Sequence, residues 1–203
     1  MSIRKKILAI SIGPVLVLGV ITLLFMLTMV KSSLMDEVQD ALKGTAAATL
    51  AAYDQNTGDY LESTNGDIWK GSYNISKSES LVDRIKENTG MDVTFFYGNK
   101  RIMTSALDKK GNRILGSEAG ERVVNQVIKG KKPFFSTNVS LDGTRNYGYF
   151  IPVYQNGTTD QVIGMVFVGT NKARKDAIVN KILGSIMMAL LVVMLLCIVT
   201  AMR

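Results

Sequence analysis

Three residues in the second half of the chain, Arg145, Tyr147 and Tyr149, have the types and the spacing of an anion-binding site. They alternate along residues 144–154, which are predicted to form a β-strand, so their side chains share one face of that strand. A guanidinium pairs with a carboxylate through two hydrogen bonds, and phenol hydroxyls donate further ones. The pattern predicts a carboxylate clamp. The alternative is that both tyrosines are ordinary strand residues and that Arg145 is a solvated charge at a turn.

Three more polar residues are candidates for the same site. Arg101 begins a predicted strand at residues 100–105, Thr104 lies within it, and Lys132 precedes the next strand. We expect a small organic anion as the ligand, with Arg145 as its main contact. Arg101 and Lys132 are the next cations in line, because the sequence contains no His that could donate to an anion.

The composition argues against catalysis. The 203 residues include no His and one Cys, so they support no zinc site, no Ser-His-Asp triad and no disulfide framework. No set of nucleophile, base and orienting group can be drawn from the remaining types. The sequence therefore predicts a protein that is not an enzyme, with no catalytic residue, no metal site and no cofactor.

Two long segments carry no charged residue, Ile7 to Val30 and Ile182 to Met202. Each is long enough to cross a hydrocarbon core of about 30 Å, which takes roughly 20 helical residues. A cleaved signal peptide is the alternative for the first segment, but its apolar stretch exceeds the ~7–15 residues usual for a signal peptide. Both segments are therefore predicted to be transmembrane helices.

Basic residues at the two ends predict the orientation. Arg4, Lys5 and Lys6 crowd the N-terminus, and Arg203 follows the second span. Short segments rich in Lys and Arg stay in the cytoplasm, which places residues 31–181 outside the plasma membrane. Lysines and arginines just before the second span oppose this orientation, but loops longer than about 60 residues largely escape the charge rule.

The outer segment has a mixed charge. Subtracting the four cytoplasmic residues from the 24 basic residues leaves 20, against 17 acidic ones. Such a balance lacks the concentrated positive charge of a nucleic-acid-binding surface. We therefore expect no nucleic-acid partner.

A long helix is predicted to continue the first span. Small or apolar side chains recur at a 4-3-4-3-4 spacing, at Leu34, Val38, Ala41, Thr45, Ala48 and Ala52. Small side chains at such positions let two helices approach closely. Two interpretations stay open, and both can hold: the helix forms a dimer and carries a signal, or it covers a sheet of its own domain. Residues 53–58 contain turn formers and are expected to end the helix.

The rest of the outer segment alternates helical and β patterns. The sequence predicts a short helix at about residues 78–87, a hairpin of strands at 92–97 and 100–105, a helix from Ser117 or Glu118 to Gly130, and strands at 133–140, 144–154 and 161–170. A five-stranded antiparallel sheet with helices on its faces accommodates this order, which is an α+β fold. Residues 59–77 are polar and interrupted by Gly, and we assign no strand there.

Five segments of the sequence resemble the single Cache domain family, the extracytoplasmic PAS-like sensor domains of bacterial chemoreceptors and sensor kinases. They are DVTFF at 92–96, RIMTS at 101–105, GSEA at 116–119, YGYFIPV at 147–153 and VIGMVFVG at 162–169. The resemblance covers roughly residues 34–172, and the flanking spans match the family's receptors as well. The chain looks most like the outer half of a methyl-accepting chemotaxis protein.

The resemblance implies a PAS-like sheet with a small-molecule ligand between the sheet and the segment at residues 106–132. The expected function is the input half of a chemotaxis receptor, which binds the ligand outside and signals across the membrane. The alternatives are the sensor module of a histidine kinase or other signalling protein, and a membrane-tethered binding or scaffold protein of the cell envelope. We expect a homodimer through the helices at residues 31–52 and the membrane spans.

The resemblance ends at the second span. Such receptors continue into a cytoplasmic signalling domain, whereas this sequence stops at Arg203. We expect a fragment of a longer receptor, the alternative being a stand-alone sensor that signals through another protein. The expected organisation is a cytoplasmic N-terminus (1–6), a first span (7–30), a sensor domain (31–181), a second span (182–202) and the start of a cytoplasmic part (203).

Overall fold

The structure, a computed structural model, describes residues 3–156 and 158–202. The chain divides into two compact units, Met1–Glu37 with Arg174–Arg203, and Val38–Ala173. The basic residues on which the predicted orientation depends, Arg4, Lys5, Lys6 and Arg203, lie outside the residues whose side chains are described, and so does the turn residue Gly157.

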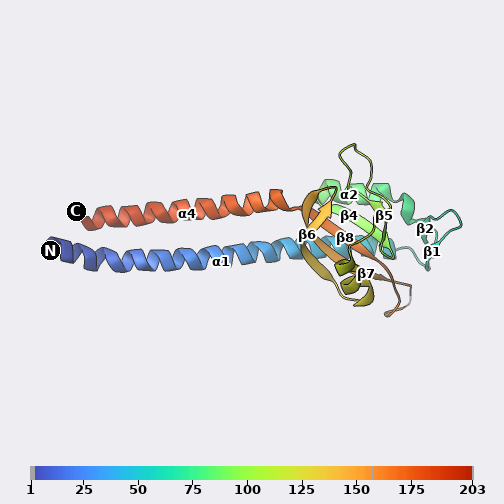
Figure 1. Ribbon diagram of the computed structural model, residues 1–203, viewed down its shortest axis with the longest axis horizontal. Helices are drawn as coiled ribbons and strands as arrows, with labels where there is room; N and C mark the ends of the chain where they lie inside the picture. Colours follow the sequence, from blue (N-terminus) through green and yellow to red (C-terminus); the bar gives the residue numbers. More distant parts are fainter. Residues whose placement is uncertain (1–2, 157, 203) are drawn as a thin grey trace. The chain divides into compact units, whose positions relative to one another are not determined.

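The first unit contains most of two long helices, α1 (Ile3–Asp54) and α4 (Lys172–Met202) (Figure 1). Each contains an 18-residue stretch apolar enough to cross a membrane, with a mean hydropathy of 2.0 in α1 and 3.0 in α4. They approach each other closely at Gly19, where an added Cβ would lie 3.0 Å from the Met194 sulfur. Large apolar side chains such as Leu18 and Leu195 are exposed on this unit, as expected of surfaces that face lipid.

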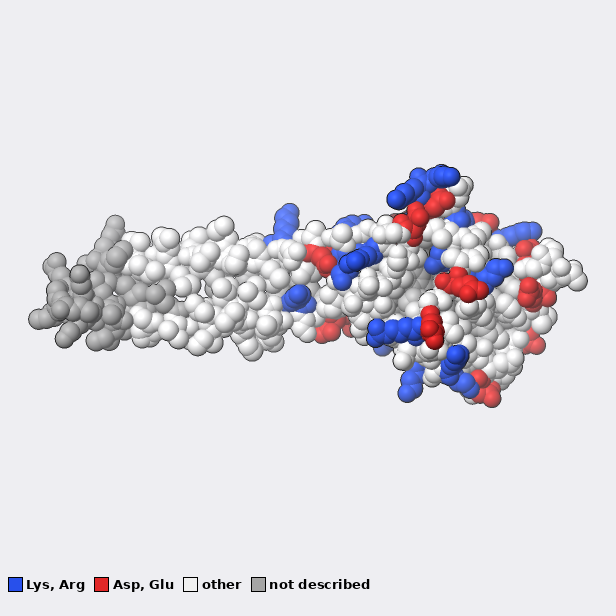
Figure 2. Space-filling view, in the orientation of Figure 1, with Lys and Arg blue, Asp and Glu red and all other residues white. Residues whose placement is uncertain are grey.

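The second unit is built around a five-stranded antiparallel sheet in the order β5-β4-β8-β7-β6. This confirms the predicted α+β fold, and each strand lies within one residue of its predicted bounds. Figure 2 shows that lysines and arginines are interspersed with aspartates and glutamates over this unit. The strands are β4 (Asp92–Tyr97), β5 (Lys100–Thr104), β6 (Phe134–Leu141), β7 (Thr144–Tyr154) and β8 (Val162–Asn171).

Side-chain alternation gives the sheet two different faces. The pairing of β7 with β8 places Tyr149 beside Val168 on one face and Phe150 beside Phe167 on the other. We call the first the helix face, because the Tyr53 ring of α1 lies edge-on to Phe95 there, with ring centroids 5.1 Å apart. The second is the cavity face, whose buried side chains include Phe96, Phe150, Met165 and Phe167.

The helix α1 covers its own domain through a different stripe from the predicted one. Its buried positions are Val38, Leu42, Ala46, Thr49 and Tyr53, whereas Ala48 of the predicted stripe is exposed. Tyr53, expected in a turn, is the last buried residue of the helix, and its hydroxyl lies 2.9 Å from the Ser78 hydroxyl. The larger side chains therefore face the sheet, and small residues remain on the exposed side.

A second, three-stranded sheet occupies residues 60–74, where no strand was predicted. It consists of β1 (Tyr60–Glu62), β2 (Ile68–Lys70) and β3 (Tyr73–Asn74), followed by a 3₁₀ turn, η1 (Ile75–Lys77). Strands of two or three residues are too short to show an alternating pattern. Their formation depends on burial of Tyr60, Ile68 and Lys70, which the local sequence does not reveal.

The two remaining helices differ in how well they were predicted. α2 (Glu79–Thr89) agrees with its prediction and ends at Gly90, whose φ of 68° is the left-handed conformation that Gly adopts readily. The predicted helix from Ser117 is shorter, comprising α3 (Glu121–Val123) and the π-helical η2 (Val124–Lys129). Residues 116–119 instead pair with the free edge of β5, where Ser117 O accepts a hydrogen bond from Arg101 N at 2.9 Å.

Candidate functional site

A cavity of about 490 Å³ lies over the cavity face of the sheet. It is bounded by single residues of β4, β5, β7 and β8, by residues 118–120, 122 and 123, and by residues 134–140 of β6. Its volume is in the range of about 300–1,000 Å³ in which proteins bind small molecules. The cavity therefore lies where the resemblance placed the ligand, between the sheet and part of the segment at residues 106–132.

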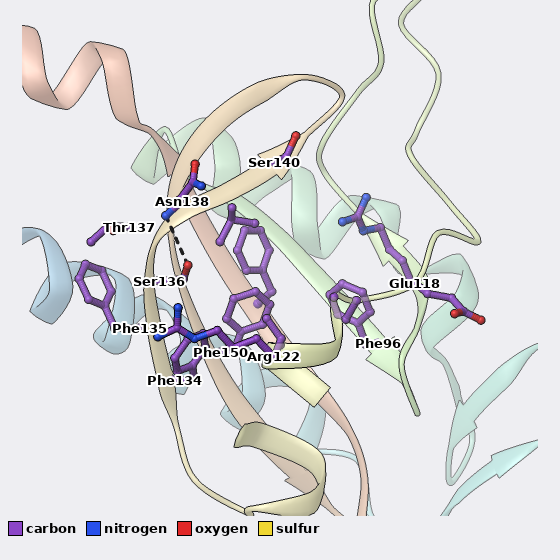
Figure 3. Close-up of a pocket in the computed structure, with 16 residues that line it drawn as sticks. Phe96, Glu118, Arg122, Phe134, Phe135, Ser136, Thr137, Asn138, Ser140 and Phe150 are labelled. Carbon is purple, nitrogen blue, oxygen red and sulfur yellow. Dashed lines mark hydrogen bonds between the residues drawn. The ribbon is translucent and has the colours of Figure 1, made fainter. Parts of the chain in front are cut away.

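Four of the five phenylalanines that line this cavity form its apolar wall, Phe96, Phe134, Phe150 and Phe167. Figure 3 labels the first three of them. The Phe150 and Phe167 rings are 4.8 Å apart, and the Phe134 and Phe150 rings 6.4 Å. Gly169 makes room for them, since a Cβ there would lie 2.4 Å from the Phe167 ring.

Arg101 is the buried cation of the cavity wall. It is 8% exposed, and its guanidinium lies 5.3 Å from the centre of the Phe96 ring. Nη1 donates to the Ile114 carbonyl at 3.3 Å, whereas Nε is buried and has no partner among the described residues. Burial lowers the pKa of the guanidinium, and the negative charge of Asp92 opposes this. A guanidinium stays protonated in proteins, so the cavity wall contains a charged donor that lacks a partner.

The polar groups at the rim of the cavity are more exposed. Arg122 lies over the Phe134 ring at 5.4 Å and is exposed. Glu118 is exposed too, and Figure 3 shows that its carboxylate extends away from the phenylalanine rings. The Ser136 hydroxyl accepts a hydrogen bond from Asn138 N at 3.3 Å, close to a bulge in the pairing of β6. The rim can therefore contact a further polar group of a ligand, while the interior combines aromatic rings with the guanidinium of Arg101.

Local sequence explains how these groups come together. Alternation along β7 and β8 directs Phe150 and Phe167 to the cavity face, and Arg101 pairs with Phe96 across β4 and β5. Gly120 starts α3, whose residues Arg122 and Val123 complete the wall. With Phe134 of β6, the charged and aromatic groups thus come from six separate elements.

The structure separates the residues predicted to bind the anion together. Of the six, Arg101 lines the cavity. Arg145, Tyr147 and Tyr149 do share one strand face, but it is the helix face, where the Tyr147 ring stacks on Phe135 at 6.4 Å and Arg145 is exposed at the strand end. Of the predicted residues, Arg101 is therefore the one that the structure places in the cavity wall.

The two other predicted residues also lie outside the cavity wall. Thr104 is buried, and its hydroxyl is engaged with the Thr94 hydroxyl at 2.7 Å and the Val93 carbonyl at 3.1 Å. Lys132 is exposed just before β6. The four phenylalanines and Arg122 were not predicted as site residues. Alternation with Tyr147 and Tyr149 would have placed Phe150 on the opposite face, but nothing in the sequence told which face is hollow.

Metal ligands are not gathered anywhere in the described part of the chain. No group of three or more His, Cys, Asp or Glu side chains there could hold a metal ion. The described cavity wall offers one buried guanidinium, hydroxyl and amide groups, and aromatic rings, which suits an organic ligand better than an ion.

The family model of single Cache domain 3 matches residues 73–182. Among solved structures, an extracellular ligand binding receptor from Desulfohalobium retbaense is 14% identical with a TM-score of 0.53, and the match covers 75% of this chain and 26% of that one. The sensory domain of a Campylobacter jejuni chemoreceptor, with isoleucine bound, is 13% identical with a TM-score of 0.51, and the match covers 78% of this chain and 62% of that one.

The two structural matches cover only part of the known proteins. The chain spans about a quarter of the first receptor and under two thirds of the second, and at this level of identity they show a shared fold alone. No curated protein matches the chain. The family model, however, matches more than half of it. The chain therefore belongs to the single Cache domain 3 family of ligand-binding sensory domains.

Proposed function

We propose that this protein is a two-pass membrane sensor whose outer domain, residues 31–181, binds a small organic anion and signals across the membrane as the input half of a chemotaxis receptor. The single observation that carries the proposal is the cavity with the buried Arg101, whose Nε has no partner among the described residues. An unpaired buried charge costs stability unless a partner of opposite sign compensates it. A ligand carboxylate would be that partner.

Chain connectivity supports a role in signalling. The helix α1 is continuous from the first predicted span to Tyr53, which packs in the core of the outer domain. On the other side, Phe167 of the cavity wall is on β8, which ends at Asn171, and α4 begins at the next residue. Neither connection contains a flexible linker of the kind that a merely tethered domain would tolerate.

A ligand can shift such a helix pair only by its different affinity for two states. Contact with Phe167 would favour one position of β8, and the helix that follows β8 would move with it. We propose that α1 and α4 shift by an ångström or two within a homodimer, and that a cytoplasmic signalling domain senses this shift.

The experiment joins residues 1–203 to the cytoplasmic part of a chemoreceptor and compares this chimaera with one carrying Gly-Gly inserted after Val38. Two glycines weaken the helix between sensor and span, so we expect the response to the ligand to disappear while affinity stays unchanged. A response that survives the insertion would contradict signalling through α1. A chimaera that binds ligand but never responds would favour the tethered binding protein.

A further inference from the structure

We infer that the ligand is a monocarboxylate with an aromatic or flat apolar body, whose carboxylate pairs with Arg101 and whose body lies among Phe96, Phe134, Phe150 and Phe167. This inference rests on the proposed function, since it concerns the same cavity. It narrows the organic anion to a chemical class, which neither the fold nor the family specifies.

The position of the carboxylate follows from the guanidinium of Arg101. Its Nη1 donates to the Ile114 carbonyl at 3.3 Å, whereas the buried Nε has no partner among the described residues, so we place the carboxylate at the edge that contains Nε. A carboxylate can accept two parallel hydrogen bonds from such an edge. The Phe96 ring under the guanidinium, at 5.3 Å, keeps one of its flat sides away from water and strengthens the charge interaction.

The apolar body follows from the wall. The ring centroids of Phe150 and Phe167 are 4.8 Å apart, and those of Phe134 and Phe150 are 6.4 Å apart. Aromatic rings attract each other at such distances. A flat ligand ring can join this cluster. Hydroxyl groups on the part of the ligand that touches these rings would lose their water without gaining hydrogen bonds from the rings.

The charges of the wall argue against two other classes of anion. The ammonium of an amino acid is best compensated by a carboxylate, but the acidic residue of the wall is Glu118, which is exposed and extends away from the rings in Figure 3. A dicarboxylate needs a second buried cation, but the other cation of the wall, Arg122, is exposed over Phe134 at the rim. Exposed charges contribute little because water screens them.

The test measures binding to the full chain in lipid nanodiscs by calorimetry, with four probes of related shape: phenylacetate, phenylalanine, benzyl alcohol and succinate. We expect phenylacetate to bind at least tenfold more tightly than each of the others, because it alone has one carboxylate, an aromatic ring and no ammonium group. Arg101→Met should weaken phenylacetate at least tenfold and leave benzyl alcohol unchanged. The matched control is Arg145→Met, which removes an exposed arginine outside the cavity and should change neither.

The outcomes separate this inference from the proposed function. If phenylalanine or succinate binds as tightly as phenylacetate and still depends on Arg101, the class is wrong while the cavity remains the sensor site. If phenylacetate binding is unaffected by both Arg101→Met and Phe134→Ala, the class and the site are both overturned. Phe134→Ala tests the cavity independently in case Arg101→Met disturbs the fold. A melting curve of each variant confirms that it is folded. Absence of binding by all four probes also overturns the inference.

Discussion

The two faces of the five-stranded sheet both carry aromatic rings, yet one is filled and the other is hollow. On the helix face, Phe95 is fully buried between the ring of Tyr53 at 5.1 Å and that of Tyr60 at 5.8 Å. On the cavity face, Phe150 and Phe167 pack on each other, but Phe134 is only partly buried beside about 490 Å³ of open volume. The same alternation of side chains therefore serves stability on one side and, as we propose, binding on the other.

Polar groups follow the same division in part. The buried Tyr53 hydroxyl lies 2.9 Å from Ser78, and burial raises its pKa well above the usual range despite that hydrogen bond. Among the described residues, the helix face has a buried atom without a partner too, Thr170 Oγ1, but it is a neutral hydroxyl. On the cavity face, the buried atom that lacks a described partner belongs to the charged Arg101, whose desolvation costs far more. Burying such a group lowers the stability of the free protein, and we propose that it serves ligand binding.

We expect the largest effect when one ring is removed from each face and the losses in the free energy of unfolding are compared. Phe95→Ala should lower the free energy of unfolding of the outer domain by about 3–5 kcal/mol, because it leaves a closed void among packed rings. Phe134→Ala should lower it by no more than about 1 kcal/mol, because the ring already borders open volume. Urea titration of the full chain in nanodiscs measures both. Equal losses would show that the faces do not differ in packing.

A smaller effect concerns the space that glycine provides. Gly169→Ala would place a methyl group 2.4 Å from the end of the Phe167 ring, so the ring must turn towards the cavity. We expect a loss of about 1–3 kcal/mol in the free energy of unfolding, together with weaker phenylacetate binding. Gly44→Ala is the matched control on an exposed turn of α1, where nothing lies within 4 Å, and should be neutral or stabilising by up to about 1 kcal/mol. Unchanged stability and binding in Gly169→Ala would contradict the claim that Gly169 makes room for the Phe167 ring of the cavity wall.

Much of the fold could be predicted from the sequence because its strands are long enough to alternate. Residues 144–154 showed both faces of β7, and their predicted bounds are those of the strand itself. The three short strands at residues 60–74 could not be predicted, since their stability depends on burial of Tyr60 and Lys70 against distant parts of the chain. The stripe of α1 was displaced for a similar reason: which side of a helix is buried depends on the surface that it meets.

The candidate site was predicted less well than the fold. The sequence showed that Arg145, Tyr147 and Tyr149 share a face, and this is confirmed, but it could not show that α1 covers that face. Arg101 was among the predicted residues on the strength of its charge and its strand. The surroundings that leave its Nε unpaired include the Ile114 carbonyl and the Phe96 ring. Both contact the Arg101 guanidinium only in the folded chain.

The central claim is that the cavity face sacrifices stability for binding at Arg101. The measurement that tests it most directly compares Arg101→Met with the unchanged chain, in urea titration without ligand and in calorimetric titration with phenylacetate. Replacing a buried, incompletely paired cation by an apolar side chain of similar length is neutral or stabilising in the free protein, so we expect a free energy of unfolding that is unchanged or higher by about 1 kcal/mol. Affinity for phenylacetate should fall at least tenfold. A clear loss of stability with unchanged affinity would contradict the account, because Arg101 would then support the fold and not the ligand.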